Sequence, residues 1–265
     1  MKKPPDRSDG QIREDASHSR PLPRAALVIP ALDEADSIGE VVERLRDQEV
    51  AVEKSIIVVD NGSTDGTGDV ARRAGARVVL EQRRGYGQAC KAGVLAAQEA
   101  DVIVLLDGDS ADDPGDLPQV LKPLLRDEAD LVVGSRALGT ADPGSMSPQQ
   151  VFGNRLTAWL MRNLHGVQVS DIGPFRAIRR DDLLALDMSE MTYGWSTEMV
   201  AKSIRAGYRY REVPVSYRRR GAGVSKVGGT LRGSVKAGFR IISTTLRYAR
   251  WNPPESASRS PREVG

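Results

Sequence analysis

The sequence predicts an α/β fold with a mostly parallel central sheet flanked by helices. Short apolar runs alternate with segments of helical periodicity between residues 25 and 134, a pattern typical of βαβ units. The run at 102–106 is apolar throughout, as expected of a parallel strand buried on both faces. The length of 265 residues is sufficient for one large α/β domain or two small ones.

The first half of the chain contains the regular alternation. The predicted strands lie at 25–30, 55–60, 77–80, 101–106 and 130–134. The predicted helices lie at 36–47, 66–74, 87–99 and 118–126. The first helix shows the spacing clearly, because its apolar side chains fall on one face: Ile38, Val41, Val42 and Leu45. Parallel strands joined in this way require right-handed crossovers.

The second half is less regular and ends in a basic segment. The predicted helices lie at 149–165, 196–206 and 230–248, and the predicted strands at 173–179 and 210–217. Residues 213–251 contain nine Lys or Arg and no Asp or Glu. The last helix is amphipathic, with apolar residues every three or four positions: Leu231, Val235, Phe239, Ile242 and Leu246. Such a helix suits a protein groove or the surface of an anionic membrane.

These patterns divide the chain into four parts. We expect a disordered polar leader at 1–24, an α/β domain at 25–229, a basic amphipathic helix at 230–251 and a disordered tail at 252–265. The leader has no apolar core like that of a signal peptide, and no apolar run approaches the roughly 20 residues needed to span a bilayer.

The bulk composition limits the function. The formal net charge of +2 gives no reason to expect a nucleic-acid partner. Cys90 is the single cysteine, which excludes an internal disulfide framework and fits a reducing compartment. The segment after the first strand, LDEADS at 32–37, is not a G-x-G-x-x-G dinucleotide motif. The chain also lacks the lysine motif of a Walker A loop.

Acidic side chains follow three of the predicted strands. Glu34 follows the first strand, Asp60 ends the second, and Asp107-Gly108-Asp109 follows the fourth. Strand ends of this kind line one crevice in a doubly wound sheet. Asp107 and Asp109 offer hard oxygen ligands to Mg²⁺ or Mn²⁺, and Gly108 lets a phosphate approach the backbone. An ordinary turn is the structural alternative, but three acidic strand ends favour a site for a nucleotide whose diphosphate is carried by a metal ion.

Eight short motifs occur in a recognisable order. They are VIPALDE at 28–34, VVDNGSTDGT at 58–67, GYGQACKAG at 85–93, LLDGD at 105–109, VVGSR at 132–136, DIGPFRAI at 171–178, GWSTEM at 194–199 and the pair Ser225-Lys226. Together they resemble family 2 glycosyltransferases of the GT-A fold, and most of all the branch of dolichyl- or polyprenyl-phosphate hexosyltransferases. The resemblance implies that 25–229 is a GT-A domain with a Rossmann-like sheet.

The resemblance also implies roles for individual residues. The nucleoside would be held by Pro30, Ala31, Glu34 and Asp60, with Lys91 and Gly108 in the same donor site. Asp107 and Asp109 would hold the diphosphate and its Mg²⁺ or Mn²⁺. The motif departs from relatives near the phosphomannosyl synthases, which often have Gln and His where this chain has Ala111 and Asp112. Asp112 is therefore open as a substitute metal ligand.

The chemistry of the acceptor side depends on the nucleophile. A phosphate monoester is already anionic and needs cationic clamping, for which Arg136, Arg176 and Lys226, with Ser225, are the candidates. A hydroxyl acceptor needs a carboxylate that takes its proton, and Glu198 and Asp171 are the choices.

The sequence thus predicts a metal-dependent transferase that moves a hexose from UDP- or GDP-hexose to a polyprenyl phosphate. We expect it in the cytoplasm, peripherally bound to the inner face of the cell membrane. The alternatives are a soluble acceptor, such as a phosphorylated small molecule or a protein, and a nucleotidyltransferase. The sugar, the nucleotide, the stereochemical outcome and the formation of a homo-oligomer stay open.

Overall fold

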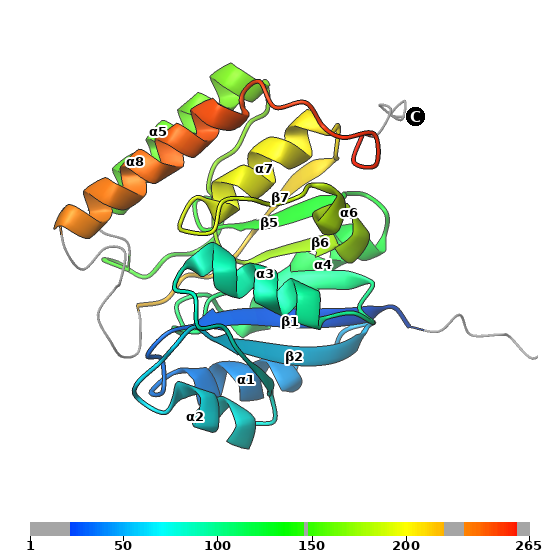
Figure 1. The fold of residues 1–265 in the computed structure, drawn as a ribbon, viewed down its shortest axis with the longest axis vertical. Coiled ribbons are helices and arrows are strands. Elements are labelled where there is room, and N and C mark those ends of the chain that lie inside the picture. Colours follow the sequence, from blue (N-terminus) through cyan, green and yellow to red (C-terminus); the bar gives the residue numbers. More distant parts are fainter. Residues whose placement is uncertain (1–21, 146–147, 220–230, 259–265) are drawn as a thin grey trace, which may run out of the picture.

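The computed structural model describes residues 22–145, 148–219 and 231–258. Seven strands form one sheet in the order β3-β2-β1-β4-β6-β5-β7 (Figure 1). β6 runs antiparallel to its neighbours β4 and β5, and every other neighbouring pair is parallel. The strands are β1 (Arg24–Ala31), β2 (Glu53–Asp60), β3 (Arg77–Leu80), β4 (Val102–Leu105), β5 (Leu131–Ser135), β6 (Arg176–Arg179) and β7 (Tyr210–Pro214).

The predicted α/β fold with a mostly parallel sheet is confirmed. Each predicted strand and helix is present, with ends shifted by a few residues. Two short elements were not predicted, the 3₁₀ helix η1 (Pro114–Asp116) and α6 (Arg180–Ala185). The other helices are α1 (Ile38–Arg46), α2 (Thr67–Arg73), α3 (Tyr86–Ala96), α4 (Leu117–Leu125), α5 (Pro148–His165), α7 (Trp195–Arg205) and α8 (Leu231–Tyr248).

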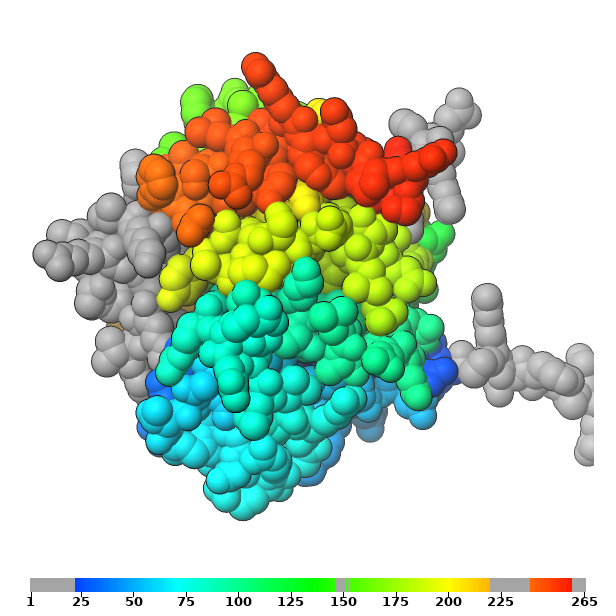
Figure 2. All heavy atoms as spheres, viewed as in Figure 1, coloured from blue at the N-terminus to red at the C-terminus, as the bar shows by residue number. Residues whose placement is uncertain are grey.

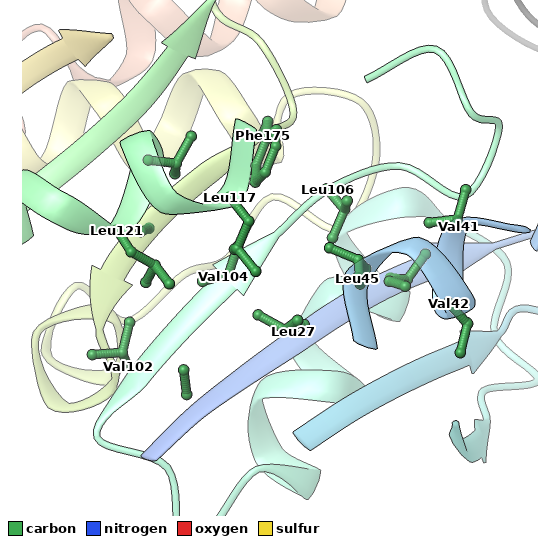
Figure 3. Packing of buried hydrophobic residues seen from close by; sticks show 14 of the residues in the cluster. Leu27, Val41, Val42, Leu45, Val102, Val104, Leu106, Leu117, Leu121 and Phe175 are labelled. Carbon is green, nitrogen blue, oxygen red and sulfur yellow. The ribbon is translucent and has the colours of Figure 1, made fainter. Parts of the chain in front are cut away.

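Apolar side chains cover both faces of the sheet. β1 shows this directly, because Leu27 belongs to one hydrophobic cluster and Val28 to the other, and both are fully buried. On the first face, β1 and β4 pack against α1 and α4 (Figure 3). On the second face, the sheet packs against α3 and α7. A central strand buried on both faces explains why the sequence reads as an unbroken apolar run.

The strand directions gather the functional motifs at one edge. The carboxyl ends of β1, β2, β4 and β5 lie at this edge, and β7 ends beside β5. Because β6 is antiparallel, its first residue lies there too, with Arg176 paired to Leu105. Residues from six strands can therefore contribute to a single site.

The C-terminal part packs on the domain. α8 contacts α5 and α7, with Tyr248 buried and Phe239 exposed. The expectation of a disordered tail from residue 252 is wrong for 252–258, because a turn after Pro254 places Ala257 in the core at 1% exposure. β1 begins at Arg24, the last residue of the predicted leader. The leader itself stays a prediction, because residues 1–21 lie outside the described part of the chain, as do 259–265. None of the helices in the described ranges is both long enough and apolar enough to cross a bilayer.

Candidate active site

A cavity of about 350 Å³ opens at the carboxyl edge of the sheet. It is bounded by the ends of β1, β2 and β4, the start of α3 and the segment before α7. Its lining residues are Pro30, Ala31, Leu32, Glu34, Asn61, Arg84, Gly85, Tyr86, Ala89, Asp107, Gly108, Asp109, Thr192 and Tyr193. Two of the three acidic strand ends, those of β1 and β4, thus meet in one cavity.

The Asp-Gly-Asp motif is held rigidly at the cavity wall. Asp109 is 4% exposed, and its Oδ1 accepts a hydrogen bond from the amide of Ala111 at 3.0 Å. The carbonyl of Gly108 accepts one from the hydroxyl of Ser37 at 2.7 Å. A Cβ on Gly108 would lie 3.1 Å from Cδ1 of Ile38. Close packing against the core therefore adds a second reason for glycine here, besides the approach of a phosphate.

Asp112 adds a further buried carboxylate next to this motif. It is 2% exposed, and neither carboxylate oxygen has a hydrogen-bond partner. Burial raises the pKa of Asp112, and the negative charges of Asp107, Asp109 and Asp171 raise it further, well above its usual range. Such a concentration of negative charge is relieved by a bound cation.

The donor set fits a divalent metal ion. In the described part of the chain, no three acidic, His or Cys side chains are grouped closely enough to hold an ion by themselves. Mg²⁺ is usually bound through one or two carboxylates together with substrate phosphates and water. Asp107 and Asp109 supply two carboxylates at the cavity wall, so a nucleoside diphosphate could complete the coordination.

The nucleoside half of the cavity is shaped by loops after β1 and β2. Pro30, Ala31 and Glu34 line it, as predicted. Asp60 does not line it; its Oδ1 accepts a hydrogen bond from the amide of Ser63 at 2.8 Å and so orders the loop after β2. Lys91 also lies elsewhere, where its ammonium donates to the carbonyl of Met188 at 3.4 Å.

Several cavity residues were missed by sequence reasoning. The side chain of Asn61 donates to the carbonyls of Glu81 and Arg83 and accepts from the amide of Gly85, which fixes the approach to α3. Its position directly after Asp60 could have drawn attention to it. The other missed lining residues are Leu32, Arg84, Gly85, Tyr86, Ala89, Thr192 and Tyr193.

Arg136 and Asp171 form a buried pair at the end of β5. Asp171 accepts hydrogen bonds from Nε and Nη2 of Arg136 at 2.6 and 2.7 Å, and from the side chain of Asn154 at 2.8 Å. The guanidinium lies over the ring of Tyr217 at 4.9 Å. Burial raises the pKa of Asp171, but the bonds from Arg136 more than reverse this and lower it. Asp171 is thus the orienting partner of Arg136 and a poor proton acceptor.

Glu198 is likewise a structural carboxylate. It is fully buried, pairs with Lys202 at 2.8 Å and accepts hydrogen bonds from the amides of Ser189 and Glu190. Burial raises the pKa of Glu198, whereas the bonds from Lys202, Glu190 and Ser189 lower it by more. The geometry therefore does not support the expected general-base role for either Glu198 or Asp171.

Arg176 is too deeply buried to bind an acceptor. Its side chain is fully buried and donates to the carbonyls of Gly173, Pro174 and Ser196. The structure does not support the expectation that Arg176 clamps the acceptor phosphate, because its side chain is fully buried. Instead it holds the segment before β6 against α7.

Ser225 and Lys226 lie outside the described residues. The chain leading towards them is anchored beside the Asp-Gly-Asp motif. The amide of Arg218 donates to the carbonyl of Ala111 at 2.8 Å, and its guanidinium pairs with Asp113. Tyr217 forms a bridge with Asp112. The basic loop, which begins at Arg218 and continues into residues outside the described part of the chain, therefore starts near the cavity.

Comparisons with known proteins agree with this geometry. The sequence profile of "Glycosyl transferase family 2" matches residues 26–186. An uncharacterized glycosyltransferase of Mycobacterium tuberculosis is 39% identical over 213 residues, which is 80% of this chain and 93% of that protein. An undecaprenyl-phosphate mannosyltransferase of Micrococcus luteus is 33% identical over 226 residues, 79% of this chain and 90% of that protein.

Solved structures share the fold. Glucosyl-3-phosphoglycerate synthase from Mycobacterium tuberculosis, crystallised with Mn²⁺, UDP-glucose and phosphoglyceric acid, superposes with a TM-score of 0.70. The match covers 88% of this chain and 82% of the other, at 24% sequence identity. The likeness establishes the GT-A architecture of the domain.

Proposed function

The chain belongs to glycosyltransferase family 2, and on that basis we propose that it transfers a hexose from UDP- or GDP-hexose to a polyprenyl phosphate. The observation that carries the proposal is the cavity at the carboxyl edge of the sheet, with Asp107 and Asp109 at its wall. Its volume of about 350 Å³ falls within the usual range of small-molecule sites.

On the donor side, Asp107 and Asp109 hold the diphosphate through Mg²⁺ or Mn²⁺. When bound, the ion supplies Lewis-acid stabilisation to the departing nucleoside diphosphate. Pro30, Ala31 and Glu34 hold the nucleoside, because they line the cavity on the side of β1. Asp60 contributes through the loop that it orders after β2.

On the acceptor side, the geometry favours an anion. The two carboxylates considered as general bases are buried and held by cations, so they do not serve a hydroxyl acceptor. A phosphate monoester needs no base. Arg136 directly follows β5 at the same edge, and its side chain, which is 11% exposed, is fixed by Asp171 in one orientation. We assign Arg136, with Ser225 and Lys226 from the basic loop, to the acceptor phosphate.

A lipid-linked acceptor explains the basic C-terminal segment. α8 carries Arg240 and Arg247 on a helix whose Phe239 and Leu246 are exposed. On α5, which packs beside it, Trp159 is exposed as well. An amphipathic surface of this kind can lie in the interface of an anionic membrane. The name of the Micrococcus luteus relative, an undecaprenyl-phosphate mannosyltransferase, supports the same acceptor class. We place the protein on the cytoplasmic membrane surface.

A soluble phosphorylated acceptor is the second candidate. It is favoured by the structural likeness to an enzyme crystallised with phosphoglyceric acid. The two candidates share an anionic nucleophile and the same donor site, so they differ only in what carries the phosphate.

One experiment separates these functions. The purified full-length protein is incubated with Mn²⁺, radiolabelled UDP-glucose or GDP-mannose, and either undecaprenyl phosphate in detergent or 3-phosphoglycerate. We expect label in the organic phase with the lipid acceptor and release of the nucleoside diphosphate. Label that stays in a phosphorylated water-soluble product supports the second candidate. A parallel incubation contains a nucleoside triphosphate and a sugar phosphate instead. Release of pyrophosphate there, without hexose transfer to either acceptor, would identify a nucleotidyltransferase and refute both glycosyltransferase candidates.

A further inference from the structure

Residues 188–194, between α6 and α7, form a bridging segment between the cavity and α8. Thr192 and Tyr193 of this segment line the cavity. Figure 2 shows the yellow-green surface of this region between the orange surface of α8 and the teal surface of α3. The same few residues therefore contact both the donor site and the C-terminal helix.

On the cavity side, the bridging segment packs directly on the backbone of α3. The carbonyl of Met191 accepts a hydrogen bond from the amide of Gln88 at 3.1 Å. A Cβ on Gly85 would lie 2.3 Å from the carbonyl oxygen of Met191, and one on Gly87 would lie 2.3 Å from that of Glu190. Contacts this close leave no room for the segment to move towards α3.

On the other side, α8 contacts the segment through three side chains. The hydroxyls of Tyr248 and Ser189 are 2.7 Å apart. Nη1 of Arg240 lies 3.7 Å from Oε2 of Glu190. A Cβ on Gly194 would lie 2.6 Å from Oγ1 of Thr244. One face of α8 is thus fitted to the segment, although the adjacent Phe239 is 73% exposed.

Glu190 connects the two sides. Its carboxylate is 5% exposed, and its Oε1 accepts hydrogen bonds from the amide, at 3.0 Å, and the hydroxyl of Thr192. Its other oxygen faces Arg240. A buried carboxylate that contacts both a cavity residue and α8 is placed where a displacement of one could reach the other.

We propose that Glu190 is a positioning residue which couples α8 to the donor cavity through Arg240 on one side and Thr192 on the other. Displacement of α8 then lowers the affinity for the donor, and donor binding by linkage favours the docked position of α8. The inference rests on the proposed function only in that the ligand of the cavity is a nucleotide sugar.

The test compares Arg240→Gln with the control Arg250→Gln. The control also removes one positive charge, but from a residue that follows the end of α8 and does not pair with Glu190. Hydrogen exchange of the amides of 188–194 is measured on the ligand-free full-length protein, together with its melting temperature. We expect Arg240→Gln to raise exchange about fivefold in this segment with little change in melting temperature, Arg250→Gln to leave exchange unchanged, and Arg240→Lys to restore the wild-type rate.

The second arm measures the ligand. With UDP-glucose or GDP-mannose and Mn²⁺, whichever the wild-type protein binds, we expect Arg240→Gln to raise the donor KM about fivefold at unchanged kcat. Exchange rates and KM equal to those of Arg250→Gln would overturn the proposal. If the wild-type protein binds neither sugar nucleotide, the proposed donor is wrong, and the exchange arm still decides whether Arg240 holds the segment.

Discussion

At the scale of single residues, the acidic cluster predicts both a metal site and an electrostatic cost to the folded state. Asp107, Asp109 and Asp112 come from one short stretch after β4, and the carboxylate oxygens of Asp112 have no hydrogen-bond partner. A site that concentrates negative charge is costly without its cation and becomes stabilised when the cation arrives.

We expect Asp109→Asn to reduce transfer about a thousandfold, because loss of the metal's charge stabilisation costs several kcal/mol in the transition state. The fold should be intact, as checked by circular dichroism and melting temperature. Asp69→Asn, which changes an exposed carboxylate on α2, is the matched control and should keep full activity.

Removal of the metal tests the same site. EDTA should abolish wild-type turnover and Mn²⁺ should restore it. Full activity after exhaustive chelation would refute metal dependence.

Asp112 makes stability depend on pH. Its pKa is raised in the folded state by burial and by Asp107 and Asp109, so the folded state binds the proton more tightly than the unfolded state does. Stability from this group therefore falls as pH rises from its unfolded value, near 4, through the folded value.

In EDTA, Asp112→Asn should therefore melt higher than the wild type at pH 7, and the difference should disappear towards pH 4. Thermal melts across this range measure it, with Asp69→Asn as the control. A constant difference across the whole range would show that the effect is packing and not charge.

The sequence located the residues whose position follows from a strand end, such as Glu34 and Asp109. It failed where the direction of a side chain decides the role. Arg176 begins a strand, and only the packing of that strand against α7 shows that its guanidinium points inward. Lys91 follows the buried Cys90 on α3. The family resemblance placed Lys91 in the donor site, but it could not show that the ammonium reaches the carbonyl of Met188 outside the cavity lining.

At the scale of elements, the close contact between α3 and the sheet is a consequence of glycine. A Cβ on Gly93 would lie 2.3 Å from Cγ1 of Val28 and 3.0 Å from Cγ2 of Val59, both buried. α3 can therefore approach β1 and β2 closely enough for its first turn to line the cavity.

We expect Gly93→Ala to destabilise the protein by about 1–3 kcal/mol, the usual cost of overpacking a core. Gly153→Ala is the matched control, because Gly153 is also helical but has nothing within 4 Å of its Cβ position. There the substitution should stabilise by about 0.5–1 kcal/mol through helix propensity. Urea denaturation measures both. Equal effects at the two sites would mean that α3 can shift away from the sheet without cost.

The order and type of the elements could be predicted because apolar periodicity reports burial. The orientation of β6 could not, since an apolar run is the same for either strand direction. The antiparallel pairing of β6 with β4 and β5 appears only in the structure, and it determines which end of the 171–178 motif lies at the site.

At the scale of the whole molecule, the basic helix α8 packs outside the helices that cover the sheet. α1 and α4 cover one face of the sheet and α3 and α7 the other, and α8 packs beside α5 and on α7 (Figure 1). Phe239 and Leu246 of α8 are exposed, and all of the charged residues of this helix are basic. A protein that takes a lipid acceptor from a bilayer would approach it with this surface.

The last prediction concerns that approach. Each Lys or Arg near an anionic bilayer contributes about 1 kcal/mol, so reversing Arg232, Lys236 and Arg247 to Glu should weaken binding at least about a hundredfold. Co-sedimentation with anionic liposomes measures this, and wild-type binding should fall as salt rises because exposed charges are screened. The control reverses Arg73, Lys122 and Arg126, three exposed cations on or beside α2 and α4, and should bind like the wild type. If the wild-type protein does not bind anionic liposomes even at low salt, the lipid acceptor loses its physical support, and the soluble phosphorylated acceptor becomes the better explanation of the partly exposed, oriented Arg136.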